Sequence, residues 1–301
     1  MDWSPDRTLT RRMAFALALT ILGYVVLLGP VFWYLPLPTA LVVTGVVVAL
    51  VALLATRADR LLYLVTQPVA VDGEDYPQLV ETVDRLANLA GVSPPAVAVI
   101  PGYEPNALSA GIGDRAVVCV TVGLLNELDD DELEAVLAHE LAHLENGDSA
   151  VMTVASFPAT VGLALLGVAV EYFDGWAYLL GYVVVLVLLA AVSVPLLVAS
   201  LPGTLALSRY REYAADRGAV AMTGDPAALA RALERLDGET DAPDTDLRRI
   251  AGFSAFCIVP VDYAPVPLPS THPPTHERVR RLRDLATELE TTRTADFPQP
   301  S

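Results

Sequence analysis

The sequence predicts a mostly α-helical membrane protein, with four transmembrane helices in two hairpins and a cytoplasmic α+β domain. Hydrophobic residues make up 53% of the 301 residues, a high share for a soluble domain. Four uncharged runs are each close to, or longer than, the roughly 20 residues that cross a bilayer. Polar segments with helix and strand patterns follow each pair of runs. The chain therefore alternates between membrane hairpins and polar segments.

The first hairpin is predicted over residues 13–56, after a polar N-terminus at 1–12. Its two uncharged runs meet at the Pro-containing break 35–38. Arg11-Arg12 before an apolar run is also typical of a twin-arginine export signal. However, the first run is too long for a signal peptide, and a second run follows without a small-residue cleavage site. The sequence therefore favours a hairpin that stays in the membrane.

The first polar segment, residues 57–148, is predicted to be the first part of the cytoplasmic domain. Apolar residues at helical spacing predict a helix over 77–90, which Gly91 ends. Short β-branched runs predict strands at 96–100 and 116–122, and Gly111 to Asp114 predict a turn between them. Carboxylates at Asp129 to Asp131 then predict the start of another helix, which Gly147 ends.

The second hairpin is predicted over residues 149–208, with an acidic outer loop at 171–176 and kinks at Pro195 and Pro202. The second polar segment, 209–290, completes the cytoplasmic domain. It carries two predicted helices, over 226–236 and 276–289. Residues 291–301 are predicted to be a disordered tail.

The arginines predict how the chain is oriented in the membrane. Those near the spans all flank one side: Arg7, Arg11, Arg12, Arg57, Arg60, Arg209, Arg211 and Arg217. The two short loops on the other side have none. The positive-inside rule then puts both termini and both polar segments in the cytoplasm. The sequence therefore predicts a multi-pass protein of the cell membrane, with the bilayer as a permanent partner.

The net charge is −17, and all 19 basic residues are arginine. An acidic chain without lysine is typical of a salt-adapted organism, in which carboxylates keep their hydration and salt screens their repulsion. A high-GC genome would explain the missing lysine but not the acidity. The charge excludes nucleic acid as a partner, because no basic stripe is present to neutralise phosphates. Cys119 and Cys257 lie in apolar runs, which predicts buried thiols in a reducing compartment.

The segment 134–148 contains the pentapeptide HELAH. On a helix His139 and His143 are four residues apart, so both rings point from one face and can bind one metal ion. Glu140 then lies beside the metal, where its carboxylate can take a proton from a water molecule. Two histidines at this spacing also occur on solvated helix faces, so the motif alone does not establish catalysis.

A catalytic zinc site needs a third protein ligand, which His272, His276 or a carboxylate would supply. Metzincins have Gly and His where this chain has Asn146 and Ser149, so that class is excluded.

The second hairpin points to Glu212 as the third ligand. The cytoplasmic ends of its two helices are neighbours, which brings Glu212 close to His139 and His143. If the helix continues, Asp216 shares a face with Glu212 and would accept the free ring N–H of a ligand histidine. The alternative is that Glu212 and Asp216 only form surface ion pairs near the membrane.

The combination of HELAH, the membrane hairpin and Ser208-Arg-Tyr-Arg-Glu-Tyr-Ala-Ala-Asp216 closely resembles the HtpX family of membrane zinc metalloproteases, relatives of the CAAX prenyl endopeptidases. The resemblance implies a zincin-like domain of the HExxH plus ExxxD type, with one zinc ion per chain. It makes His139, His143 and Glu212 the zinc ligands, Glu140 the general base and Asp216 the support of a ligand.

Two further segments resemble the family. Residues 105–111 (PNALSAG) resemble its edge strand for an extended substrate, which implies that Asn106 contacts the substrate. Residues 270–278 resemble its STHP…ER segment, which implies that His272 hydrogen-bonds the developing oxyanion and Arg278 braces the loop. Without the resemblance, Asn106 would be interpreted as a turn residue and His272 as a loop histidine.

The predicted function is zinc-dependent endopeptidase activity on polypeptides, by resemblance on misfolded or damaged membrane proteins at the cytoplasmic side, as part of a stress response. A CAAX-prenyl-protease-like peptidase is the nearest alternative, but that class has more spans. An intramembrane protease would bury its motif in a span, and the preceding DDDELE is too charged for lipid. A non-catalytic zinc-binding scaffold is the third alternative, although a structural site has no use for Glu140. The sequence predicts no oligomeric state.

Overall fold

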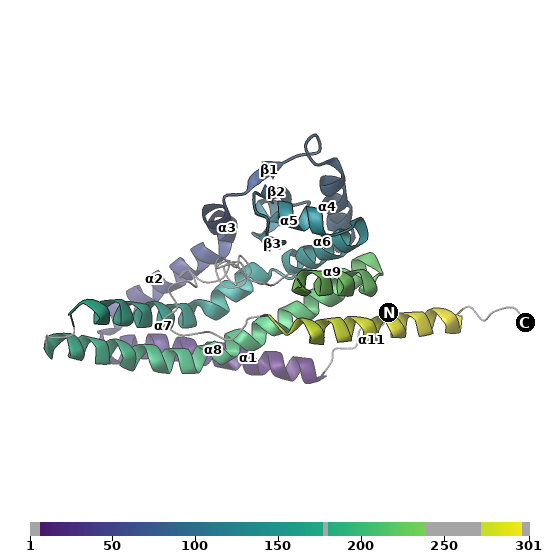
Figure 1. Cartoon of the computed structure of the whole chain (residues 1–301). Helices are drawn as coiled ribbons and strands as arrows, with labels where there is room; N and C mark the ends of the chain where they lie inside the picture. The colour runs from purple at the N-terminus through teal and green to yellow at the C-terminus, as the bar shows by residue number, and fades with distance from the viewer. Residues whose placement is uncertain (1–6, 177–179, 239–271, 297–301) are drawn as a thin grey trace, which may run out of the picture. The chain divides into compact units, whose positions relative to one another are not determined.

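The computed structural model describes residues 7–176, 180–238 and 272–296 (Figure 1). The chain divides into two compact units. The first comprises Met1–Ala58, Ser149–Tyr210 and Arg249–Thr271, and the second comprises Asp59–Asp148, Arg211–Arg248 and His272–Ser301. Cys257, predicted to be a buried thiol, lies outside the described residues.

The four predicted membrane spans are confirmed as long apolar helices. These are α1 (Arg7–Tyr34), α2 (Leu37–Thr56), α7 (Asp148–Trp176) and α8 (Leu180–Thr223). Each contains a stretch long and apolar enough to cross a membrane: Phe15–Tyr34, Leu37–Thr56, Asp148–Val168 and Val184–Thr223. The last stretch has 40 residues, about twice what a bilayer needs. The C-terminal part of α8 therefore extends beyond a membrane span.

The helices differ from the predicted boundaries in three places. Helix α2 begins at Leu37, because Pro38 lies in its first turn, where a missing N–H costs nothing. Residues 171–176, predicted as an outer loop, continue α7. Pro195 and Pro202 lie inside α8, which continues past both of them.

The described helices of the first unit pack through small residues and polar bonds to the main chain. A Cβ added at Gly203 of α8 would lie 2.7 Å from the Cβ of Leu19 in α1. Thr204 donates a hydrogen bond to the carbonyl of Ala155 in α7 (3.1 Å), and the hydroxyl of Tyr24 donates to the carbonyl of Val154 (2.9 Å). In a bilayer the hydrophobic effect does not drive helices together, so close packing and interhelical hydrogen bonds stabilise their association.

The second unit contains a four-stranded mixed sheet in the order β1-β2-β4-β3 (Figure 1). Its strands are β1 (Val69–Val71), β2 (Ala96–Ile100), β3 (Ala107–Ala110) and β4 (Val117–Thr121). Strands β2 and β4 are parallel, whereas β1 and β3 pair antiparallel to them. The predicted strands at 96–100 and 116–122 are thus confirmed, and the segment that resembled a substrate-binding strand forms β3 at an edge of the sheet.

Helices α4 (Pro77–Ala90), α6 (Asp130–Glu145) and α9 (Pro226–Gly238) share one hydrophobic core with the sheet. The core contains Leu86 of α4, Val118 of β4, Leu137 of α6 and Leu229 of α9, all nearly inaccessible to solvent. The shorter elements are α3 (Ala58–Thr66), the 3-10 turn η1 (Gly113–Arg115) and α5 (Val122–Glu127). Helix α6 thereby has a fixed position against the sheet.

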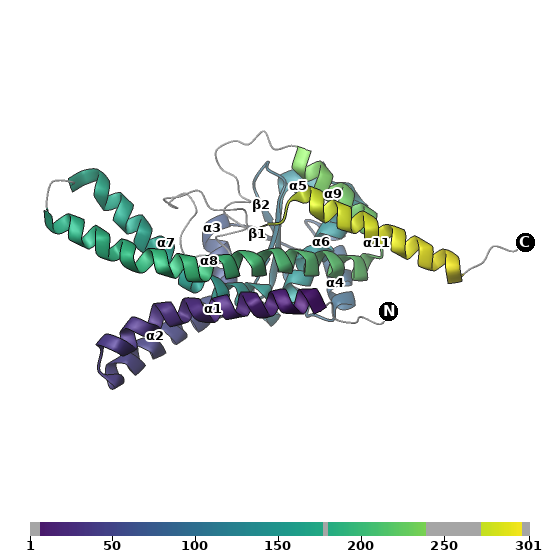
Figure 2. The same cartoon turned by 90° about the horizontal axis from the view of Figure 1, so that it is seen from below.

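Helix α11 (Thr275–Asp296) lies beside α9 in both views (Figures 1 and 2). It was predicted to end at Leu289 but continues to Asp296, because no Gly or Pro interrupts it before Pro298.

Cys119 of β4 is a free, buried thiol, as predicted. Burial, together with the nearby negative charge of Glu140, raises the pKa of this thiol to about 12. The side chain therefore stays a neutral thiol at physiological pH.

Candidate active site

Helix α6 presents the HELAH motif from a rigid position. Asp129 caps the helix: its side chain accepts from the N–H of Glu132, and the Glu132 side chain accepts from the N–H of Asp129 in return. This capping box fixes where the helix begins, and hence which face its residues present. His139 and Glu140 are both buried.

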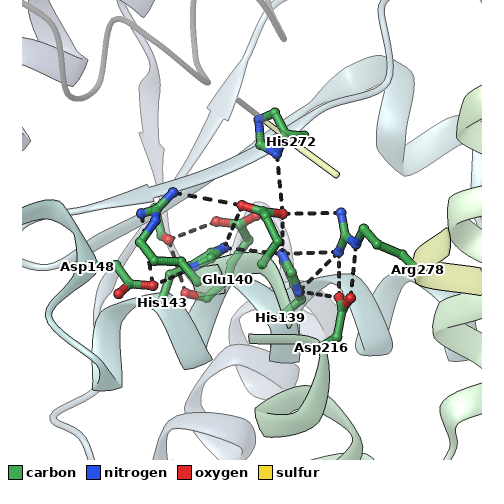
Figure 3. A network of polar contacts seen from close by, with 10 residues as sticks. His139, Glu140, His143, Asp148, Asp216, His272 and Arg278 are labelled. Carbon is green, nitrogen blue, oxygen red and sulfur yellow. Dashed lines mark hydrogen bonds and ion pairs between the residues drawn. The ribbon is translucent and has the colours of Figure 1, made fainter. Parts of the chain in front are cut away.

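Helix α8 brings Glu212 to the two histidines (Figure 3 shows the cluster). Its side chain is only 2% exposed. Its two oxygens lie 3.6 Å from the Nε2 atoms of His139 and His143, and these two nitrogens are 3.2 Å apart. Ligands at about 2.1 Å from a tetrahedral zinc ion are separated by about 3.4 Å. The two nitrogens and the carboxylate are the donor types that zinc prefers, at about the spacing that a zinc ion requires, and the three residues form a cluster among the described residues that could hold a metal ion.

A carboxylate lies against the other ring nitrogen of each histidine (Figure 3). Asp216 Oδ1 is 3.1 Å from Nδ1 of His139, as the i, i+4 spacing with Glu212 predicted. Asp148 Oδ2 is 2.6 Å from Nδ1 of His143. A carboxylate at Nδ1 holds the ring so that Nε2 offers its lone pair to a metal. The sequence analysis predicts the contact of Asp216 but not that of Asp148.

Arg278 of α11 binds both acidic residues of α8. Its Nε donates to Asp216 (3.0 Å), its Nη2 makes a second short bond to the same carboxylate, and its Nη1 lies 3.2 Å from Glu212. Burial lowers the pKa of the guanidinium, but the carboxylates of Asp216 and Glu212 outweigh that effect and raise it. Arg278 thus contacts a candidate metal ligand and the carboxylate that supports His139, while its predicted role in bracing a loop stays a prediction.

The buried side chains of the cluster carry a net negative charge that a divalent cation would neutralise. Four carboxylates and two guanidinium groups meet there: Glu140, Asp148, Glu212, Asp216, Arg211 and Arg278. With neutral histidines their formal charge is two negative, and buried charge of this kind needs a counter-charge. Burial lowers the pKa of His139, but its bonds to Asp216 and Glu212 raise that pKa to about 9, so without a metal ion this ring takes up a proton and supplies part of the missing positive charge. The charge balance of the site thus fits a Zn²⁺ ion.

The other two predicted residues also lie in the second unit. Nδ1 of His272 is 3.3 Å from Glu212, and the His272 side chain is 42% exposed. The main-chain N–H of Asn106 donates to Thr121 (2.9 Å), whereas its side-chain nitrogen is buried and has no partner among the described residues. Ser270 and Thr271 of the predicted STHP segment lie outside the described residues, and His276 is exposed.

Comparison with known proteins identifies the family. The sequence profile of peptidase family M48 matches residues 74–286, which include every site residue above. The chain belongs to peptidase family M48. It is 40% identical to Protease HtpX homolog 1 of Streptomyces coelicolor over 296 residues, covering 94% of this chain and 95% of the relative.

Two other relatives match over nearly their whole length. Protease HtpX homolog 2 of Methanosarcina mazei is 35% identical over 294 residues, covering 95% of this chain and 98% of the relative. Protease HtpX homolog of Moorella thermoacetica is 37% identical over 303 residues, covering 96% and 98%. The crystal structure of S. mikatae Ste24p matches with a TM-score of 0.49 and 18% identity, covering 92% of this chain and 66% of that one.

These relatives confirm the resemblance to HtpX and the enzyme class. The M48 chain is a multi-pass membrane metalloprotease, a hydrolase of peptide bonds. Metalloproteases of family M48 depend on zinc in general, and the His139, His143 and Glu212 cluster offers a fitting donor set.

Gly218 allows α8 to approach α6 closely at this M48 site. A Cβ at Gly218 would lie 2.7 Å from the Cβ of Ala142, which stands between Glu140 and His143 on α6. Neither atom belongs to a flexible side chain, so Gly218→Ala must push the two helices apart. We expect a loss of about 1–3 kcal/mol of unfolding free energy and a lower zinc content.

The matched control moves the methyl group to the other helix. In Gly218→Ala combined with Ala142→Gly, one Cβ again fills the contact, so stability and zinc content should recover beyond the sum of the single changes. Thermal unfolding and metal analysis measure both. If the double variant is as impaired as the single changes together predict, close approach is not the reason for Gly218.

Proposed function

We propose that this M48 peptidase uses one zinc ion per chain to cleave membrane proteins, above all misfolded or damaged ones, at the cytoplasmic side of the cell membrane. The observation that carries the proposal is the spacing of His139, His143 and Glu212, with Glu140 between the two histidines in the HELAH motif of the same helix. A site that only held a structural metal would have no use for Glu140, which is not among the three donors.

The proposed roles divide between the metal and the side chains. Zinc, when bound, would polarise the scissile carbonyl and make water more acidic. Glu140 takes the proton of the attacking water and passes it to the leaving amine. Asp216 and Asp148 hold the rings of His139 and His143. Arg278 keeps Glu212 and Asp216 in place and balances their charge.

Strand β3 is the proposed docking site for the substrate. Among the strands that the structure describes it pairs with β4 alone, so its other edge can take an extended segment through main-chain hydrogen bonds. Asn106 precedes it directly, and its side-chain nitrogen, which has no hydrogen-bond partner among the described residues, is suited to donate to a substrate carbonyl. Because main-chain bonds do not depend on side-chain identity, this mode favours broad specificity.

His272 is proposed to stabilise the developing oxyanion. Its contact with Glu212 keeps the ring beside the donor cluster, and its partial exposure leaves it accessible to substrate. A donor aimed at a developing negative charge is the usual means of lowering this kind of barrier.

The cytoplasmic orientation follows from the arginine pattern and is tested by labelling. In a Cys257→Ser background, Tyr103→Cys places a thiol on a residue that is 94% exposed, while Cys119 stays buried. A membrane-impermeant maleimide should label it only after the cells are opened. Trp33→Cys, at the far end of α1 and 82% exposed, is the control that should react with intact cells. Labelling of Tyr103→Cys in intact cells would reverse the proposed topology.

The substrate class is tested in cells. Membranes from cells with the wild-type protein should contain peptide fragments of membrane proteins that are missing when Glu140→Gln replaces it. Fragments that derive only from soluble proteins would contradict the proposed substrate class without affecting the assignment as a peptidase.

A further inference from the structure

The edge strand contacts the proposed general base directly. Ser109, the third residue of β3, donates a hydrogen bond to Oε2 of Glu140 (2.7 Å) and also lies 3.0 Å from the main-chain carbonyl of Glu140. Ser109 is 8% exposed and Glu140 is 9% exposed. The sequence alone does not predict this contact, since the two residues are far apart in the chain.

We infer that Ser109 is a positioning residue that holds the Glu140 carboxylate in the conformation in which it acts as a base. The inference rests on the proposed function, in which Glu140 takes the proton. A hydroxyl has only one hydrogen, and a bond to an ionised carboxylate is stronger than one to a neutral carbonyl. The 2.7 Å contact is therefore the one that fixes the side chain.

Glu140 depends on Ser109 because the other acids of the cluster bind an arginine or a histidine, and no such bond holds the Glu140 side chain among the described residues. Asp216 and Glu212 bind Arg278, and Asp148 binds His143. The contacts that the structure gives Glu140 among the described residues come from Ser109. A glutamate side chain has three rotatable bonds, so without this bond its carboxylate would populate several rotamers.

The strand makes the restraint rigid. Ser109 pairs with Val118 of β4, and β4 lies inside the sheet between β2 and β3. The hydroxyl is thus fixed by the sheet, while Glu140 is fixed at its main chain by α6. A base held between two such elements keeps the distance that proton transfer requires.

Four variants of the full-length protein test the inference with a fluorogenic peptide substrate: Ser109→Ala, Ser109→Val, Ser109→Thr and Glu140→Gln. Threonine keeps the hydroxyl, and valine has the same shape without it. Ser109→Ala and Ser109→Val should lower kcat by about tenfold, a fraction of what a general base contributes, with little change in KM. Ser109→Thr should stay within about threefold of wild type, since strands accept β-branched residues.

Two readouts do not depend on activity. Zinc content and melting temperature of Ser109→Ala should match those of wild type, and its crystal structure should show the Glu140 carboxylate in more than one rotamer. Ser156→Ala, another buried serine in α7, is the matched control and should leave kcat unchanged.

The outcomes separate the inference from the proposed function. If Ser109→Ala keeps wild-type kcat while Glu140→Gln is inactive, the inference is overturned and the proposed function stands. If Ser109→Thr is as slow as Ser109→Val, or if zinc is lost, Ser109 is a packing residue and the inference is again overturned. If Glu140→Gln remains active, the proposed function itself fails.

Discussion

Glu140→Gln is expected to lower kcat for peptide hydrolysis by a factor of about 10³, within the range of roughly 10²–10⁴ that general acid–base catalysis contributes. The amide keeps the shape of the side chain but cannot take a proton. Because Glu140 is not one of the three donors at zinc-ligand spacing, the zinc content should stay near one per chain. Steady-state kinetics and metal analysis of the purified variant measure both.

Glu134→Gln provides the matched control for this change. Glu134 lies on the same helix and forms its ion pair at the surface, with Arg85 at 2.6 Å. Such pairs contribute little, so activity should be unchanged. Wild-type activity of Glu140→Gln would contradict the proposed function, in which Glu140 accepts the proton.

Glu212→Ala is expected to abolish zinc binding at physiological metal concentrations. The change removes one of three donors and leaves the buried guanidinium of Arg278 with one carboxylate instead of two. An uncompensated buried charge adds a folding cost to the loss of affinity. Equilibrium dialysis against a zinc buffer measures the affinity, and thermal unfolding with and without zinc measures the coupled stability.

Asp148→Asn is the comparison variant, for which only a partial loss of zinc affinity is expected. It removes a carboxylate that lies against His143 but does not lie among the donors, so the affinity should fall only about 10- to 100-fold. Equal losses for Glu212→Ala and Asp148→Asn would contradict the assignment of Glu212 as a ligand. Retention of zinc by Glu212→Ala would do so more directly.

Much of this site was predictable because its spacing is local. His139 and His143 follow from the helical period, and Glu212 and Asp216 share the same i, i+4 relation on a second helix. The pairing of these two helices follows from the hairpin that connects them. The four apolar helices and the strands at 96–100 and 116–122 were predictable for the same reason, since composition and short periods decide them.

The contacts that the sequence did not predict depend on packing between distant segments or on the change of backbone direction between two helices. Asp148 reaches His143 only because α6 ends and Gly147, with a φ of 64°, redirects the backbone before α7 begins. Ser109 reaches Glu140 because β3 packs on α6, which no periodicity reveals. The contacts of Arg278 with Glu212 and Asp216 were not predicted, because they depend on how α11 packs against α8. Residues 171–176 were read as a loop from their polarity, yet nothing in them before Gly175 breaks a helix.

In the proposed docking mode, the length of β3 sets how much of a substrate protein must be accessible. Four residues span about 13 Å when extended, so a partner strand added to the free edge needs only a short stretch of loosened backbone. A substrate protein would not have to unfold as a whole, because one locally unfolded turn or loop would be enough to pair with β3. Such an enzyme would recognise local loss of order and not a sequence, and intact neighbours in the same membrane would be spared because their backbones are already hydrogen-bonded.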